Sequence, residues 1–147
     1  HGLVLGRPPR RAVRRRQGLR RYTGGQKPVV THPSIVGLNG PARFDPAPVD
    51  RERVTQGAPV AAADNRYSSA DGRFHAGLWT STVGCWRIAY TEDEACTILR
   101  GRIRLTGDDG TVCEFGAGDA FVIPAGFIGT WETLEDCLKH YVIYEQA

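Results

Sequence analysis

Short runs of alternating apolar and polar residues begin near Tyr67 and continue almost to the end of the chain. Branched and aromatic residues dominate these runs, and turn signals separate them every eight to twelve residues, as is typical of strands. One such signal, Asp108-Asp109-Gly110, has the composition of a tight hairpin turn. The expected strands are Leu78–Thr82, Trp86–Tyr90, Cys96–Arg100, Ile103–Thr106, Val112–Phe115, Ala120–Ile123, Gly129–Thr133 and Tyr141–Tyr144. Eight short strands without a helix pattern predict an all-β sandwich or barrel, and a double-sheet jelly roll is one way to close them.

The preceding part of the chain divides into two zones of different composition. Residues 1–27 hold nine of the 19 lysines and arginines and no acidic residue. They predict a disordered basic tail, or an artefact of cloning or of the translation start; a basic arm for nucleic acid or anionic lipid and an Arg-rich transit peptide are the alternatives. Residues 28–66 are rich in proline, which favours an extended arm that packs on the barrel or on a partner subunit. Residues 67–147 are expected to form the barrel itself.

Length and charge narrow the possible roles of the protein. The 147 residues, 41% of them hydrophobic, suffice for one domain with one core, and no apolar run approaches the ~20 residues of a membrane-spanning helix. After Lys27 the chain has 10 basic and 16 acidic residues, so nucleic acid is not expected as a partner of the folded part. The four cysteines are widely spaced, which favours free thiols in a soluble, cytoplasmic protein and leaves a Cys85–Cys137 bridge open.

Two half-motifs in the second half of the chain carry a family resemblance. Gly118–Gly126 contains a glycine, five residues, Pro124, one residue and a glycine, and it resembles the second motif of the cupins. Glu94, followed after six residues by Gly101, resembles the end of the first cupin motif. Over about seventy to eighty residues the chain resembles a branch of small, single-domain, uncharacterised bacterial cupins, related to ureidoglycine aminohydrolases and to the cupins of ethanolamine utilisation. The resemblance implies a double-stranded β-helix, which is a jelly-roll barrel.

The resemblance also shows which metal ligands are missing. Cupin metal sites use two histidines at i and i+2 on one strand, then a glutamate, and a third histidine from the second motif. In this chain those four places fall on Ile88, Tyr90, Glu94 and Gly129. Only Glu94 is retained, so we expect no typical metal centre and no cofactor.

Strand alternation places a set of aromatic and polar side chains on the inner face of the barrel. The resemblance to the aminohydrolases implies that Lys139 and Tyr141 share this face. We therefore expect Glu94 and Lys139 to be proton-transfer groups. The expected ligand-binding residues are Trp86, Tyr90, Cys96, Trp131 and Tyr141. The alternatives are a structural carboxylate for Glu94, an exposed charge at a strand end for Lys139, core packing for the aromatic residues and a packed thiol for Cys96.

Other candidate residues are expected at the surface. Glu92 is assigned to a solvated bend near the mouth of the barrel, and His75 and His140 to strand edges or the surface. None of them is expected to bind a metal.

Three functions remain compatible with the sequence. The first is a cupin that binds a small polar metabolite in the barrel without a metal. The second is an enzyme, a hydrolase, lyase or isomerase similar to ureidoglycine aminohydrolases, with Glu94 and Lys139 as acid and base. The third is a structural barrel that serves to dimerise. A homodimer is expected, because the segment Pro28–Asn65 offers material for strand exchange.

Overall fold

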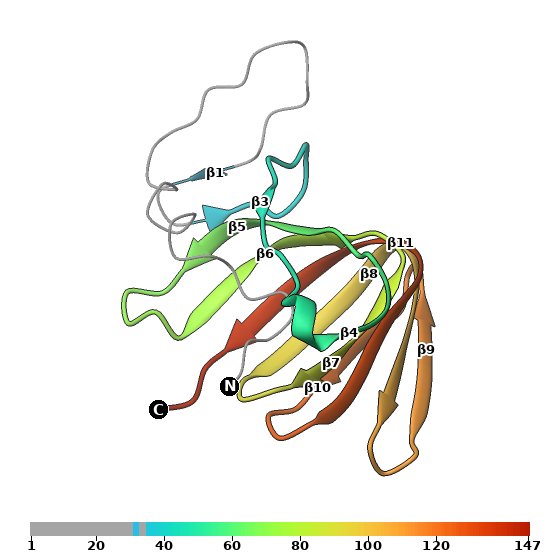
Figure 1. The fold of residues 1–147 in the computed structure, drawn as a ribbon. Coiled ribbons are helices and arrows are strands. Elements are labelled where there is room, and N and C mark those ends of the chain that lie inside the picture. The colour runs from blue at the N-terminus through green and yellow to red at the C-terminus, as the bar shows by residue number, and fades with distance from the viewer. Residues whose placement is uncertain (1–30, 33–34) are drawn as a thin grey trace.

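Two long strands organise the molecule, whose structure is a computed structural model that describes residues 31–32 and 35–147. They are β8 (Asp93–Gly107) and β11 (Ile128–Tyr144), which pair antiparallel from Gly129 opposite Gly107 to Tyr144 opposite Asp93. Every other strand of the nine-stranded sheet attaches directly or indirectly to one of these two. The sheet therefore curls around the β8–β11 pair (Figure 1).

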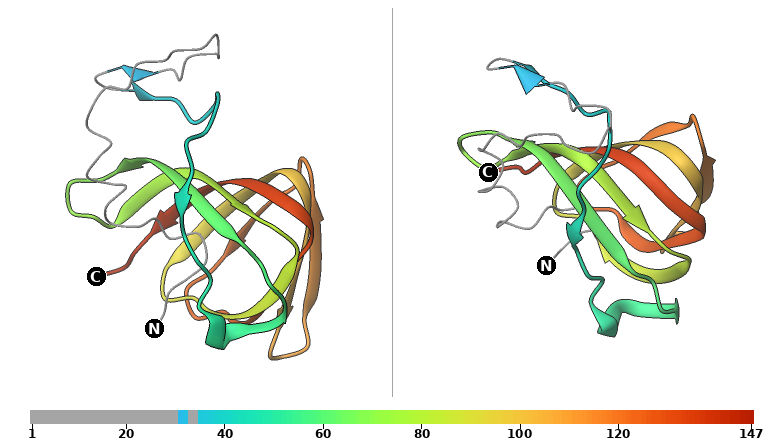
Figure 2. Two further views of the ribbon diagram at one scale, coloured as in Figure 1. Left: turned by 45° about the horizontal axis from the view of Figure 1, so that its top comes forward. Right: turned by 90° about the horizontal axis from the view of Figure 1, so that it is seen from above.

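The sheet has two halves, which we name after the strands that pair with β11. The β6 half contains the start of β8, the end of β11, and β3 (Asp45–Pro46), β5 (Ala61–Ser68), β6 (Phe74–Ser81) and β10 (Ala120–Ile123). The β7 half contains the other parts of β8 and β11, and β4 (Val54–Gly57), β7 (Gly84–Ala89) and β9 (Val112–Gly116). Two views from further directions show the halves curling towards each other (Figure 2). The expectation of an all-β jelly-roll barrel is confirmed.

Little else in the described residues is regular. A separate two-stranded sheet joins β1 (Thr31–His32) to β2 (Ile35–Val36), and a short 3-10 helix, η1, spans Arg51–Arg53. No helix within residues 31–32 and 35–147 has the length and apolar character needed to cross a membrane.

A glycine bends β8 where it passes from one half to the other. Gly101 has a φ of +90°, a conformation that glycine adopts without the steric cost other residues incur. A Cβ added there would lie 2.2 Å from the carbonyl oxygen of Asp136. The two strands predicted at Cys96–Arg100 and Ile103–Thr106 are therefore one bent strand.

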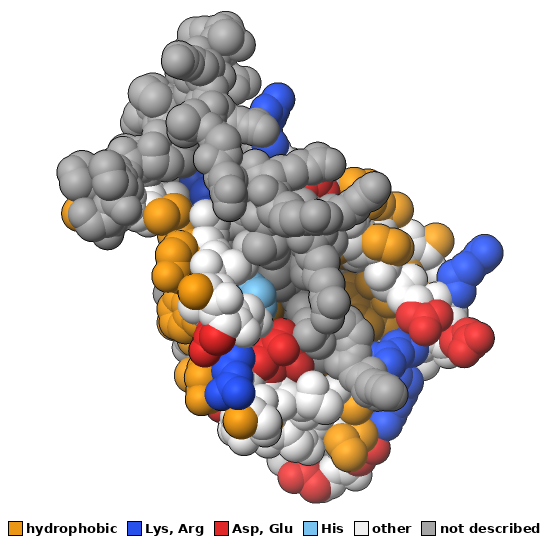
Figure 3. Space-filling model, turned by 90° about the vertical axis from the view of Figure 1, so that its left-hand side faces the viewer, with side chains coloured by type: hydrophobic (Ala, Val, Ile, Leu, Met, Phe, Trp, Pro, Cys, Tyr) orange, Lys and Arg blue, Asp and Glu red, His pale blue; other side chains and the backbone are white. Residues whose placement is uncertain are grey.

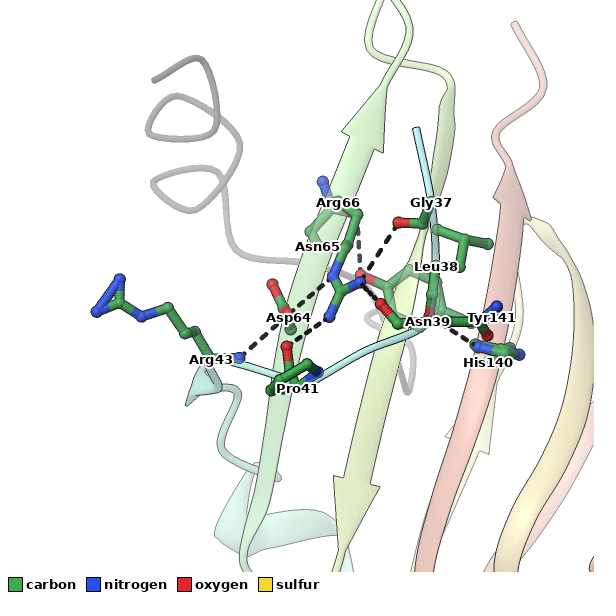
Figure 4. Close-up of polar contacts among 10 residues, drawn as sticks. All are labelled: Gly37, Leu38, Asn39, Pro41, Arg43, Asp64, Asn65, Arg66, His140 and Tyr141. Carbon is green, nitrogen blue, oxygen red and sulfur yellow. Dashed lines mark hydrogen bonds and ion pairs between the residues drawn. The ribbon is translucent and has the colours of Figure 1, made fainter. Parts of the chain in front are cut away.

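A buried arginine ties the proline-rich arm to the outside of the barrel (Figure 4). The Arg66 guanidinium donates to the carbonyl oxygens of Asn39 at 2.6 Å, Pro41 at 3.0 Å and Gly37 at 3.3 Å. Its Nε donates to the Asp64 carboxylate at 3.0 Å, and both side chains are only 4% exposed. The part of the arm from Gly37 to Pro41 is thus bound by a cation whose charge Asp64 balances.

Two more contacts extend this attachment. The backbone N–H of Arg43 donates to Asp64 at 3.2 Å, and Nε2 of His140 lies 3.0 Å from the Leu38 carbonyl oxygen. The predicted boundary of the arm at residue 66 stays a prediction, although β5 runs across that point and pairs with β6. The predicted tail, residues 1–27, lies outside the described residues.

Replacing Arg66 with methionine is expected to lower the free energy of unfolding by roughly 3–5 kcal/mol, because it removes the guanidinium that pairs with the buried Asp64 carboxylate. Urea unfolding followed by tryptophan fluorescence measures this change. Arg43→Met is the matched control, since Arg43 is exposed and contacts Asp64 through its backbone N–H, which the substitution keeps. Equal stabilities of the two variants would contradict the role given to Arg66.

Candidate functional site

A buried ion pair lies inside the β6 half of the barrel. Nζ of Lys139, on β11, donates to Oε2 of Glu94, on β8, at 2.8 Å. Neither side chain has any solvent exposure. Alternation explains the placement, because Glu94 and Cys96 on β8 and Lys139 and Tyr141 on β11 are all buried while their neighbours in sequence are more exposed. Two residues 45 positions apart thus meet through strand pairing.

Further polar groups complete the surroundings of the pair. The Tyr90 hydroxyl donates to the other carboxylate oxygen, Oε1 of Glu94, at 2.6 Å. The Cys96 sulfur lies 3.6 Å from Nζ of Lys139. Both oxygens of Glu94 therefore have a donor, which offsets part of the cost of removing the carboxylate from water.

Two tryptophans flank the ammonium group. Nζ of Lys139 lies 4.6 Å from the ring centroid of Trp79 and 4.5 Å from that of Trp131. The two rings meet edge to face, with centroids 5.4 Å apart. Nε1 of Trp131 donates to the Thr133 hydroxyl at 3.0 Å, which fixes the orientation of that ring. The cation is thus held by a carboxylate and by the electron-rich faces of two indoles.

Burial and neighbouring charges determine the protonation states. Burial lowers the pKa of Lys139, but nearby Cys96 and Glu94 outweigh this effect, so the pKa lies above its usual value. Burial, with the negative charge of Glu94, raises the pKa of Tyr90 and of Cys96 well above their usual values. At neutral pH, Lys139 is a fixed cation while the phenol and the thiol are neutral. Cys96 is therefore a packed thiol rather than a nucleophile.

The structure brings together most of the residues expected at the site. Glu94, Lys139, Tyr90, Cys96 and Trp131 meet around the ion pair. The other two lie next to it: Trp86 contacts Trp79 with centroids 6.3 Å apart, and the Tyr141 hydroxyl donates to Asn65 at 2.9 Å. Whether these residues bind a ligand stays a prediction.

Trp79 was missed by the sequence analysis, although it flanks the cation directly. β6 is buried at five consecutive positions from His75 to Trp79, so alternation did not mark its inner face. A signal was present in the sequence, since tryptophan is rare in this chain and Trp79 lies on a predicted strand.

Two residues expected at the surface are buried. His75 is 8% exposed and Glu92 is 1% exposed. His75 lies on β6 directly opposite Ser68 of β5, a strand that the sequence did not indicate. Their predicted surface positions are therefore wrong.

The residues at the four metal-ligand places do not fit a metal. Ile88 is apolar and packs in the core, and the Tyr90 hydroxyl donates to Glu94. A Cβ added at Gly129 would lie 2.0 Å from the carbonyl oxygen of Thr106, so the backbone leaves no room for a side chain. Within the described residues, no group of three or more His, Cys, Asp or Glu side chains could hold a metal ion. A typical cupin metal centre is not compatible with this arrangement.

An apolar hollow opens beside the ion-pair site, between β9 and β10. It has a volume of about 130 Å³. Its lining residues are Leu105, Gly107, Thr111, Cys113, Phe115, Phe121, Val122, Ile123, Pro124 and Phe127. The Phe121 ring stacks on Phe115 with centroids 4.1 Å apart and lies 6.5 Å from Trp131. Phe121 and Trp131 thus separate the hollow from Lys139.

The four cysteines are free thiols that differ in their burial. All four are free, as favoured by their spacing, and Cys85, Cys96 and Cys137 are buried while Cys113 is exposed. Burial raises the pKa of Cys137 to about 11. The bridge left open between Cys85 and Cys137 is not formed.

Solved structures with similar folds come from several bacteria. A protein of unknown function from the DUF861 family of Pseudomonas syringae matches with a TM-score of 0.64 and 20% identity, over 69% of this chain and 44% of that one. The putative ethanolamine utilization protein Q of Salmonella typhimurium matches with a TM-score of 0.53 and 20% identity, over 60% of this chain and 72% of that one. The Clostridium difficile EutQ protein matches with a TM-score of 0.52 and 17% identity, over 58% and 63%. At these identities the likeness concerns the fold.

The family model of the EutQ-like cupin domain matches residues 68–141, from the last residue of β5 into β11. This chain spans less than half of the Pseudomonas protein. No curated protein matches the present chain significantly. The expected relation to ureidoglycine aminohydrolases stays a prediction. The family match and the curled, antiparallel sheet show that this chain belongs to the EutQ-like cupin domains.

Proposed function

We propose that this cupin domain binds a small polar metabolite inside its barrel, without a transition metal. The observation that carries the proposal is the ion pair of Glu94 and Lys139, held between two tryptophans at the place of the usual metal site. Glu94 occupies the one retained ligand position and binds an ammonium group instead of a metal. Lys139 thus takes over the role of the resident cation.

The cost of burying charge supports a functional role for the pair. A buried ion pair frequently makes a protein no more stable than well-packed apolar residues of the same size would. If the barrel interior served only as a packed core, Lys139 would give it no more stability than an apolar residue at this position. Burial and neighbouring charges shift the pKa values of Lys139, Tyr90 and Cys96, and ionisable groups perturbed in this way are more typical of binding and catalytic sites.

The hollow suggests how a ligand approaches the pair. Its lining is mostly apolar and includes Phe121, whose ring lies 6.5 Å from Trp131, one of the two indoles that flank Lys139. A turn of these rings would connect the hollow with the ammonium group. The ligand proposed here therefore combines a flat apolar part, which contacts the phenylalanines, with a polar group that reaches Lys139.

An enzyme that uses Glu94 and Lys139 is the second candidate. The raised pKa of Lys139 assigns it the role of a fixed cation or an acid, and Glu94 is then the base. A small hydrolase, lyase or isomerase is compatible with such a pair. Turnover of a ligand that binds the wild-type protein, and its loss in Glu94→Gln, would favour this second function.

A homodimer remains part of the proposal, and the outer face of the β6 half supports it. Val122, Ala95 and Val142 lie side by side across β10, β8 and β11. Val122 is 63% exposed and Leu99, further along β8, is 39% exposed. The outer face of the β7 half instead carries ion pairs such as Arg104–Glu114. Light scattering of the purified protein measures the mass that distinguishes dimer from monomer.

Thermal-shift screening of polar metabolites with a ring or other flat group is expected to find compounds that raise the melting temperature. Cys113→Trp, at an exposed position of β9 that lines the hollow, should abolish the shift. Val112→Trp should keep it, because Val112 is similarly exposed on β9 but does not line the hollow. The same preparation should contain well under one equivalent of Mn, Fe, Ni or Zn. A stoichiometric metal, or equal shifts in both variants, would overturn the proposal.

Removing one member of the ion pair is expected to destabilise the barrel more than removing both. Lys139→Met and Glu94→Leu should each cost roughly 3–5 kcal/mol, because each leaves a buried polar partner uncompensated. The double variant Glu94→Leu/Lys139→Met should recover much of that loss. Urea unfolding of the four proteins measures the coupling between the two sites. Additive losses would show that the two groups do not act as a pair.

A further inference from the structure

A second chain of polar contacts lies at the rim of the β6 half, apart from the ion pair. The Tyr141 hydroxyl donates to Oδ1 of Asn65 at 2.9 Å, and Nδ2 of Asn65 donates to the Ser68 hydroxyl at 2.9 Å. Oγ of Ser68 lies 2.7 Å from Nδ1 of His75, and Nε2 of His75 lies 3.7 Å from Oε2 of Glu145. Five side chains from β5, β6, β11 and the segment after β11 thus form one line from the barrel interior outwards.

Strand pairing explains why these residues meet. Ser68 and His75 are directly opposite each other on β5 and β6, and Ile143 is opposite His75 on β11. Ile143 is fully buried, so this register points all three side chains to the inner face. A bulge in β5 between Asn65 and Tyr67 brings Asn65 to the same side as Ser68, three residues later.

The direction of the contacts favours one tautomer of His75. The Ser68 oxygen already accepts a hydrogen bond from Asn65, so the Ser68 hydroxyl can donate its own hydrogen bond to Nδ1 of His75. Nε2 of a neutral His75 then carries the ring proton and faces the Glu145 carboxylate. The opposite Asn65 orientation would place an unprotonated Nε2 against a carboxylate, which is electrostatically unfavourable. The chain therefore favours a hydroxyl that donates to an imidazole whose other nitrogen faces a carboxylate at 3.7 Å.

We infer that Ser68, His75 and Glu145 form a nucleophilic relay that reacts with small esters of short acyl chains. A hydroxyl, an imidazole and a carboxylate in this order are the parts that activate a serine for acyl transfer. The Asn65 amide and the Glu145 carboxylate are positioning groups for Ser68 and His75. This inference does not depend on the Glu94–Lys139 pair.

The chemical step follows from these contacts. Oγ of Ser68 attacks the ester carbonyl carbon while its proton passes to Nδ1 of His75. The bond between the acyl carbon and the alcohol oxygen breaks, and the alcohol leaves with the proton held by His75. Water then attacks the acyl group on Ser68 by the same route, releasing the carboxylic acid and restoring the serine. Glu145 stabilises the imidazolium that forms transiently.

The setting of the relay is suited to a small substrate. Ser68 is half-buried, and the side chains of His75 and Glu145 are 10% and 23% exposed. The side of the molecule that carries the β5–β6 hairpin shows a histidine next to acidic side chains in the space-filling view (Figure 3). Ser69, the next residue, provides an internal comparison, because its hydroxyl donates to the carboxylate of exposed Asp71 at 2.6 Å instead of to an imidazole.

Labelling of the full chain with a small fluorophosphonate tests the inference. We expect one adduct, mapped by peptide mass spectrometry to Ser68 rather than Ser69. p-Nitrophenyl acetate should give a burst of nitrophenol of about one equivalent, which Ser68→Ala abolishes. His75→Gln should slow labelling at least ~100-fold, the lower range for loss of a general base. Glu145→Gln, at a more exposed position, should slow it while leaving the melting temperature unchanged.

The outcomes separate a relay from a structural network. No adduct on the wild-type protein, or equal labelling of Ser68 and Ser69, overturns the inference. A labelling rate that Glu145→Gln and His75→Gln leave unchanged also overturns it. If His75→Gln fails to fold, the wild-type peptide map and the Glu145→Gln rate decide the question. Because Glu94 and Lys139 take no part, these results are independent of metabolite binding in the barrel.

Discussion

The buried contact between Glu94 and Lys139 is the interaction on which the inside of this barrel depends. It places two charges where water has no access, so each charge requires partners from the protein. Tyr90 supplies a donor to the carboxylate, and two indole faces supply a negative potential to the ammonium group. The aromatic core is thus arranged around a cation, and the orientation of its rings follows from that charge as much as from packing.

The backbone provides the space for this arrangement through a few close approaches. A Cβ added at Gly77 would lie only 2.8 Å from the Tyr141 hydroxyl, so a glycine makes room for that hydroxyl. The glycine at position 129 allows β11 to approach β8. Gly101 bends β8, so that one strand contributes to both halves of the barrel. The glycines therefore have two roles here: they shape the curled sheet, and at Gly129 they exclude the side chain that a metal site would need.

Much of the fold could be predicted from the sequence, because each expected strand has its own alternating pattern and turn signals. β10 was predicted with its observed ends. β5 was missed, since Ala61–Ala63 give no alternation between apolar and polar residues and the surrounding prolines favoured an arm. For the site, Glu94 was marked by its motif position. Trp79 and His75 were not, because the contacts that define them come from strands whose register the sequence does not show.

The inner face of the barrel is divided along the β8–β11 pair. In the β7 half the inward positions are mostly apolar, among them Ile88, Ile103 and Trp86. In the β6 half the inward positions include the ion pair and the chain of polar contacts at the rim, which ends at Glu145. A buried polar group is costly unless its partners are fixed, so concentrating such groups in one half leaves the other half free to pack as an ordinary core. A molecule that enters the barrel would thus meet apolar surface on one side and fixed charges on the other, and this asymmetry would orient it.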